Sequence, residues 1–247
     1  MTTGLDIAAE HAGLLTALRQ AGRPYRGGVQ NDSYSGSGRP FLNVSAPDRR
    51  RIVRAWLAAH RTLAGEALLV LVDSLLDGET HEERTLAALL VGASARARRA
   101  ATPARVDRWI GALNGWAEID TLCASVFGPD DLAADWPAWR ALIEALSRDA
   151  NINKRRAALV LLVTPTRTSD DARFRDLGFD VIERLKPERA ILITKAVSWL
   201  LRAMTAHHAA AVNAYLDAGA ASLPAVAVRE TRTKLRTGTK SGRGVAG

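Results

Sequence analysis

Apolar residues recur at intervals of three and four along nearly the whole chain, which is the period of an amphipathic α-helix. A β-strand is indicated by a run rich in β-branched residues that alternates apolar and polar positions, and such runs are nearly absent. The pattern therefore predicts an all-α protein. Helices are expected at residues 5–20, 45–62, 65–76, 82–98, 103–113, 116–127, 137–148, 152–162, 170–185, 187–206, 209–217 and 224–235.

Turn and capping residues mark where these helices begin and end. Prolines 47, 103, 137, 187 and 224 stand at predicted helix starts, where the missing N–H costs no hydrogen bond. Ser45-Ala46-Pro47-Asp48 has the form of a capping box. The stretch from Gly27 to Pro40 is rich in Gly and Ser and predicts a loop, and residues 237–247 lack apolar periodicity and predict a disordered tail.

Four short segments resemble one another, each with a charged residue followed by small and apolar ones. They are His81–Leu90, Trp116–Ser125, Ile152–Val160 and Ile193–Leu201. Their charged positions are separated by 36, 36 and 39 residues. Repeats of this length form α-solenoids, in which each helical unit packs on the next. We therefore expect residues 1–236 to form a single α-solenoid domain.

The second repeat has an acid where the others have a base. The aligned residues are Arg84, Asp120, Arg156 and Lys195. Equivalent positions of stacked repeats point the same way, so the neighbouring bases should favour the ionised form of the acid. Trp116 lies one turn before the acid, and Trp199 and Arg202 share a helix face with Lys195.

Two interpretations of this row of charges stay open. It is either a ladder of salt bridges between repeats, with the tryptophans as core residues, or a carboxylate framed by two indoles on a basic surface. The net charge of +8 favours a polyanionic partner. Six of the bases lie between Arg229 and the C-terminus, where they either steer nucleic acid or form a solvated tail.

Other classes of protein are disfavoured by composition. The single cysteine, Cys123, allows neither an internal disulfide nor a zinc cage, so we expect no metal and a reducing compartment. The first 20 residues lack a secretory signal, and no run of 18 apolar residues exists to span a membrane. We expect a cytoplasmic protein.

Several groups of residues, taken in chain order, resemble the AlkD-like DNA alkylation repair glycosylases. They are Tyr34, Phe41-Leu42 with Pro47-Asp48-Arg49-Arg50, His81-Glu82-Glu83-Arg84, Trp116 with Asp120, Asn151 with Arg155-Arg156-Ala157-Ala158, and Lys195-Ala196 with Trp199 and Arg202. The resemblance runs from about residue 34 to residue 230. It implies a curved, HEAT-like solenoid whose concave basic face holds duplex DNA, so we expect association with the nucleoid when the protein is bound to DNA. A groove that binds a duplex needs no partner subunit, so we also expect a monomer, and we expect no cofactor.

The resemblance also implies an activity and a set of roles. Cationic N3- or N7-alkylated purines, such as 3-methyladenine and 7-methylguanine, are excised for base excision repair without base flipping. Asp120, Trp116 and Trp199 contact the damaged nucleotide as catalytic residues. Among the DNA-binding residues, Arg156 and Tyr34 correspond by position to residues of the family. Arg84, Lys195 and Arg202 are added because they belong to the row of bases or share a helix face with it. Arg84 is alternatively a structural residue of its own repeat.

Three residues depart from the family's pattern and bear on substrate preference and rate more than on reaction class. They are Ser45, Ala117 and Asn153.

Two other functions compete with the glycosylase. One is a non-catalytic relative that binds DNA structures, and the other is a protein-interaction solenoid, a common use of such arrays.

Overall fold

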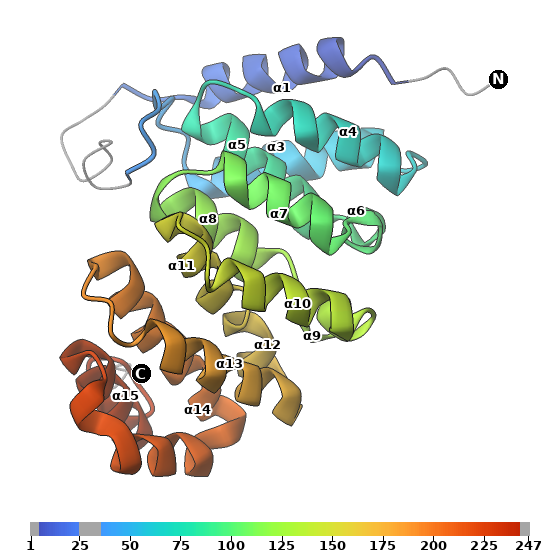
Figure 1. Ribbon diagram of the computed structural model, residues 1–247. Helices are drawn as coiled ribbons and strands as arrows, with labels where there is room; N and C mark the ends of the chain where they lie inside the picture. Colours follow the sequence, from blue (N-terminus) through green and yellow to red (C-terminus); the bar gives the residue numbers. More distant parts are fainter. Residues whose placement is uncertain (1–4, 25–35, 243–247) are drawn as a thin grey trace. The chain divides into compact units, whose positions relative to one another are not determined.

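The computed structural model describes residues 5–24 and 36–242 (Figure 1). Every regular element in these two ranges is helical, and none of their residues forms a strand. The prediction of an all-α protein is confirmed. The chain divides into two compact units, with the boundary between Val126 and Phe127.

The first unit is organised around one buried helix. Its elements are α1 (Ile7–Ala21), α3 (Ala46–Ala59), α4 (Gly65–Leu76), α5 (His81–Ala93), α6 (Ala95–Ala100), α7 (Pro103–Ala112) and α8 (Gly115–Ser125). Helix α5 packs against α1, α3, α4, α6 and α8. Because neighbours surround it, even the polar residues of its first turn are buried.

The second unit also has a central helix. Its elements are α9 (Pro129–Ala133), α10 (Trp136–Leu146), α11 (Ile152–Val160), α12 (Val163–Thr168), α13 (Ala172–Leu185), α14 (Ile191–Gly219), a 3₁₀ turn (Ala220–Ser222) and α15 (Ala225–Thr237). Helix α14 packs against α11, α12, α13 and α15. The apolar run from Ala157 to Val163 is fully buried and forms the core beside it.

One predicted helix is divided in the structure, and one predicted break between helices is found as a kink. The helix expected over 82–98 is interrupted at Ser94, whose backbone is extended and whose hydroxyl accepts a bond of 3.3 Å from the Ala97 amide at the start of α6. Local capping chemistry therefore interrupts this periodic pattern. The break expected between the helices 187–206 and 209–217 is confirmed, because α14 consists of two helical stretches separated by a kink at His208, whose backbone is not helical.

Helix α14 also begins later than predicted, at Ile191, so Pro187 lies in the preceding turn rather than at the helix start. Helices α9 and α12 were not predicted, because five or six residues are too few to show a helical period.

The predictions for the start of α3 and for the C-terminal segment are confirmed in part. Ser45 caps α3 by accepting from the Asp48 amide at 3.2 Å, but the Asp48 carboxylate accepts from the Ser45 hydroxyl instead of completing a capping box. Helix α15 continues to Thr237, the first residue of the predicted tail, and ends at Gly238 in the left-handed region. Of the expected loop, residues 36–40 are described and contain no helix.

Candidate functional site

Trp116 and Asp120 lie one turn apart on the same face of α8, and both side chains are partly exposed. The helix begins at Gly115, whose φ of 72° lies in the left-handed region that glycine adopts without strain. This conformation turns the chain from α7 into α8 within a few residues. It therefore places Trp116 in the first turn, with its side chain on the face that carries Asp120.

A second acid of α8, Glu118, has the opposite environment. Its side chain is buried, and its carboxylate accepts a bond from the Asn114 amide at 3.1 Å. The other carboxylate oxygen lies 3.2 Å from Nδ1 of His81 and 3.9 Å from Nε of Arg39. Glu118 therefore ties the start of α8 to the start of α5.

Glu118 was missed by the sequence analysis, although the repeat contains a signal for it. It stands two positions before Asp120, as Glu82 stands two positions before Arg84. Glu82 is also buried and accepts from the amides of Leu42 at 2.9 Å and Val44 at 3.3 Å. The buried acid at this repeat position therefore holds a neighbouring segment of backbone. Glu118 holds the residues that lead into α8, and Glu82 holds the segment that packs beside α5.

The segment 36–45 runs along the start of α5. The Pro40 carbonyl accepts from the His81 amide at 3.1 Å, and the Phe41 ring stacks on the His81 ring with centroids 4.6 Å apart. Together with the Arg39–Glu118 pair, these contacts fix the segment to both α5 and α8. Tyr34, a predicted DNA contact, lies just before it and outside the described residues.

Arg84 is buried in the first unit. Its Nε donates to the Gly78 carbonyl at 3.1 Å, and its Nη1 donates to the Ala112 carbonyl at the end of α7. Burial, the largest influence, and Arg39 lower the pKa of Arg84, while nearby acids raise it. With 7% of the residue exposed and backbone partners for its guanidinium, Arg84 fits the structural alternative rather than a phosphate contact.

Arg156 has a similar environment in the second unit. It is 5% exposed, and its Nη1 donates to the Leu192 carbonyl in the first turn of α14. The side chain therefore joins α11 to α14. A role toward DNA would add to this structural contact, not replace it.

The remaining predicted residues lie on α14. Lys195 is exposed, Trp199 and Arg202 are partly exposed, and their spacing of four and then three residues puts them on one helix face. Nε of Arg202 donates to Ser198 Oγ at 3.3 Å and lies 3.4 Å from Glu230 Oε2 on α15. This face combines an indole with two cations.

The predicted residues thus belong to two units. Trp116 and Asp120 lie in the first, and Arg156, Lys195, Trp199 and Arg202 lie in the second. Within each unit the helical spacing that the sequence predicted is confirmed. Their convergence on one concave face stays a prediction.

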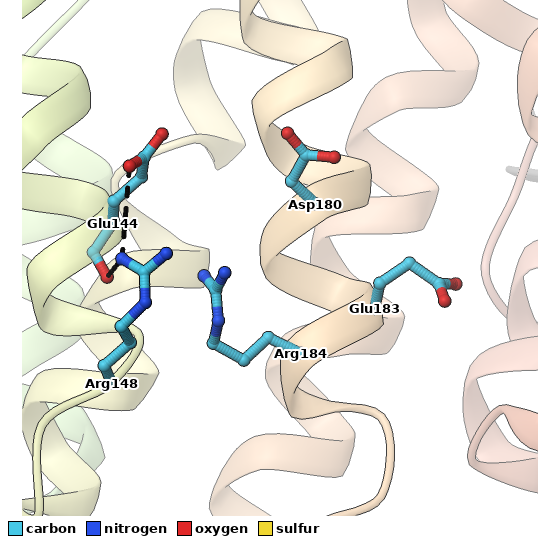
Figure 2. Close-up of a pocket in the computed structure, with 5 residues that line it drawn as sticks. All are labelled: Glu144, Arg148, Asp180, Glu183 and Arg184. Carbon is cyan, nitrogen blue, oxygen red and sulfur yellow. Dashed lines mark hydrogen bonds and ion pairs between the residues drawn. The ribbon is translucent and has the colours of Figure 1, made fainter.

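A pocket of about 530 Å³ lies in the second unit, away from the predicted residues. Figure 2 shows it between α10 and α13, where Arg148 and Arg184 extend toward one another. Glu144, Asp180 and Glu183 complete its lining. Three acids against two bases make this pocket a poor site for a polyanion.

The described residues contain neither a group of side chains suited to a metal ion nor a helix suited to cross a membrane. Within 5–24 and 36–242, no three His, Cys, Asp or Glu side chains are grouped so as to hold a metal ion. The helices of the same two ranges include none with the length and apolar character needed to cross a membrane. Cys123 is buried in α8.

Comparison with known proteins identifies relatives. A family model described as "DNA alkylation repair enzyme" matches residues 14–235. A solved structure described as a predicted DNA alkylation repair enzyme from Enterococcus faecalis is similar, with a TM-score of 0.63 and 20% identity over 81% of this chain and 90% of that chain. The shared fold confirms the predicted α-solenoid class. A comparison with curated proteins found no match.

Proposed function

Because the chain belongs to the family of DNA alkylation repair enzymes, we propose that it is a monofunctional DNA glycosylase for N3- and N7-alkylated purines. Membership supports a role in DNA repair, and we propose the substrate class from the resemblance of Trp116, Asp120 and Trp199 to the AlkD-like glycosylases. The observation that carries the proposal is the pairing of a partly exposed carboxylate, Asp120, with the indole of Trp116 on one face of α8.

The two acids of α8 divide their roles by environment. Glu118 is buried and serves the contacts between α5 and α8, so it is a structural acid. Asp120 keeps exposed surface and stands on the face that carries Trp116. Asp120 is therefore the acid that we assign to chemistry.

One carboxylate suffices for this reaction. An N3- or N7-alkylated purine already carries positive charge, so it leaves as a neutral base and needs no proton from a general acid. Positive charge develops on the sugar as the glycosidic bond breaks, in the manner of an oxocarbenium ion. The Asp120 carboxylate stabilises that charge and orients or deprotonates the attacking water.

The tryptophans select for the charged lesion. The faces of Trp116 and Trp199 attract a cationic nucleotide through cation–π contact, an effect of about 0.5 to 2 kcal/mol each. This attraction requires no pocket that encloses the base, so the base stays within the duplex during excision. Neutral purines lack the charge and are discriminated against.

Phosphate contacts hold the duplex. Lys195 and Arg202 present cations on the face of α14 that carries Trp199, and Arg156 and Tyr34 are further candidates from the family resemblance. Arg84 is left out of this set because backbone carbonyls occupy its guanidinium. The expected partner is therefore alkylated double-stranded DNA, bound by a monomer without a cofactor.

The decisive test is release of 7-methylguanine or 3-methyladenine from methylated duplex DNA. We expect Asp120→Asn to lower the single-turnover rate by about 100-fold or more, since it removes the charge that stabilises the transition state. Asp77→Asn, which changes an exposed acid at the end of α4, is the matched control and should keep the rate of the parent protein. No release by the parent protein on any alkylated substrate would refute the proposal.

A further inference from the structure

A polar cluster joins α14 to α15 and to the chain that follows α15. The buried Ser198 hydroxyl donates to Glu230 Oε2 at 2.7 Å. Nε of Arg202 lies 3.3 Å from Ser198 Oγ and 3.4 Å from the same carboxylate oxygen. Nζ of Lys240 lies 3.4 Å from Glu230 Oε1, the second oxygen of that carboxylate.

One carboxylate therefore serves two cations. The pKa of Glu230 is lowered, because the Ser198 hydrogen bond and the charges of Lys240 and Arg202 outweigh the effect of burial. Glu230 is thus ionised at neutral pH, and the cluster carries an excess of one positive charge. That excess is a feature expected of a group that awaits an anion.

The guanidinium of Arg202 is held through its Nε atom, which lies close to Ser198 and Glu230. Within residues 5–24 and 36–242, its side chain donates a hydrogen bond through Nε, and Nη1 and Nη2 donate none. The side chain is 16% exposed. A guanidinium fixed at Nε with two amino groups unbound is prepared to donate to a phosphate oxygen pair.

The chain after α15 folds back to reach the cluster. Gly238 adopts a φ of 74° and ends the helix, and Thr237 and Thr239 bond to one another across the turn. This turn returns Lys240 to Glu230, so part of the basic C-terminal sequence lies beside Arg202, one turn beyond Trp199 on α14.

We propose that Arg202 and Lys240 form a phosphate-binding site for duplex DNA, and that Glu230 is the counter-ion that they share until a phosphate displaces it. The inference rests on the proposed function, because it takes DNA as the partner. It assigns Lys240 and the turn after α15 to the DNA-binding surface. It also gives Glu230 a restraining role, since each bond that it makes to a cation competes with phosphate.

The test measures binding to undamaged duplex DNA as a function of salt. Lys240→Ala removes one phosphate contact, so affinity should fall by about three- to tenfold and the negative slope of log K against log salt should become smaller in magnitude by about 0.9. Glu230→Gln keeps the hydrogen-bonding shape but removes the competing charge, so binding should tighten by about threefold at low salt.

A matched pair of controls exists on α13. Glu183 accepts from the Tyr215 hydroxyl at 2.6 Å and pairs at 2.6 Å with Lys186, the residue that follows α13. This cluster has the same kinds of contact as Ser198, Glu230 and Lys240 but does not include Arg202. Lys186→Ala and Glu183→Gln change net charge by the same amounts. They should leave affinity and salt slope close to those of the parent protein.

The outcomes separate this inference from the proposed function. The side chain of Lys240 is 60% exposed, so Lys240→Ala should fold like the parent protein. If this variant binds DNA with the affinity and salt slope of the parent, the phosphate site is refuted. Base release by the parent protein would not be affected by that result. If the α13 controls shift binding equally, only net charge matters and the site is refuted. If the predicted shifts occur without base release, the site is supported and the glycosylase is not.

Discussion

Within one helix, two acids two residues apart are placed in opposite environments. Asp120 is partly exposed, whereas Glu118 is buried among groups from Asn114, His81 and Arg39. A buried carboxylate is stable only while its donors remain in place. Residue chemistry alone does not separate the two acids, and the packing of α8 on α5 does.

We predict that Glu118→Gln lowers the free energy of unfolding by about 1 to 3 kcal/mol, because the amide has one acceptor oxygen for the partners Asn114 N and His81 Nδ1 and lacks the charge that pairs with Arg39. Denaturant unfolding followed by circular dichroism measures this. Asp77→Asn serves again as the exposed control. A change within a few tenths of a kcal/mol would show that Glu118 is not the anchor of α8.

The sequence could predict some of the candidate site but not all of it. The four-residue spacing of Trp116 and Asp120 determines a shared helix face, and the structure confirms that face. The repeat register aligned Arg84 with Asp120, but it carries no information on burial. Arg84 proved to bond to backbone carbonyls because neighbouring helices surround α5.

At the scale of elements, the kink of α14 falls at His208, between the two helices that the periodicity predicted. His208 has φ −125° and ψ 34° inside a helix, is 8% exposed, and has no hydrogen-bond partner at Nε2 within the described residues. Burial, the largest cause, together with Arg175 and His207 lowers the pKa of His208, while Asp170 and Asp176 raise it. The neutral imidazole is therefore the form that the kink accommodates.

We predict that the protein loses stability as the pH falls below about 6.5, the ordinary pKa of histidine. The unfolded chain binds the proton more readily than the folded one, so acid favours unfolding with a slope of at most about 1.4 kcal/mol per pH unit. Urea unfolding at pH 7.5 and 5.5 should show a smaller loss for His208→Gln than for the parent protein. His207→Gln removes one of the smaller influences that lower the pKa of His208, so its loss should lie between those of the parent and His208→Gln, and equal losses in all three would contradict the assignment.

The left-handed backbone of Gly115 determines how the chain enters α8. Gly115→Ala places a side chain at a φ of 72°, which costs about 1 to 2 kcal/mol and favours a different entry into the helix. Because Trp116 follows directly, we expect both lower stability and slower base release. Gly13→Ala, in α1 where an added Cβ meets no atom within 4 Å, is the control and should not lower stability.

At the scale of the whole molecule, the periodic pattern predicted the helical class and most helices, since each buries one apolar face. The division between Val126 and Phe127 was not predicted, because the repeat pattern is uniform across that point. The pattern also could not rank functions. A ladder of salt bridges and a DNA-binding face use the same residue types, and the family match favours DNA.

Two measurements on the intact chain separate the three functions considered. If Lys195, Arg202 and Lys240 each replace one counter-ion of duplex DNA, the slope of log K against log salt should be about −2.7. A protein-interaction solenoid predicts no duplex binding, and a non-catalytic relative predicts this slope without base release. Since only the glycosylase requires the Asp120 carboxylate, salt-dependent binding that survives Asp120→Asn, together with base release that does not, is the combination that the proposed function demands.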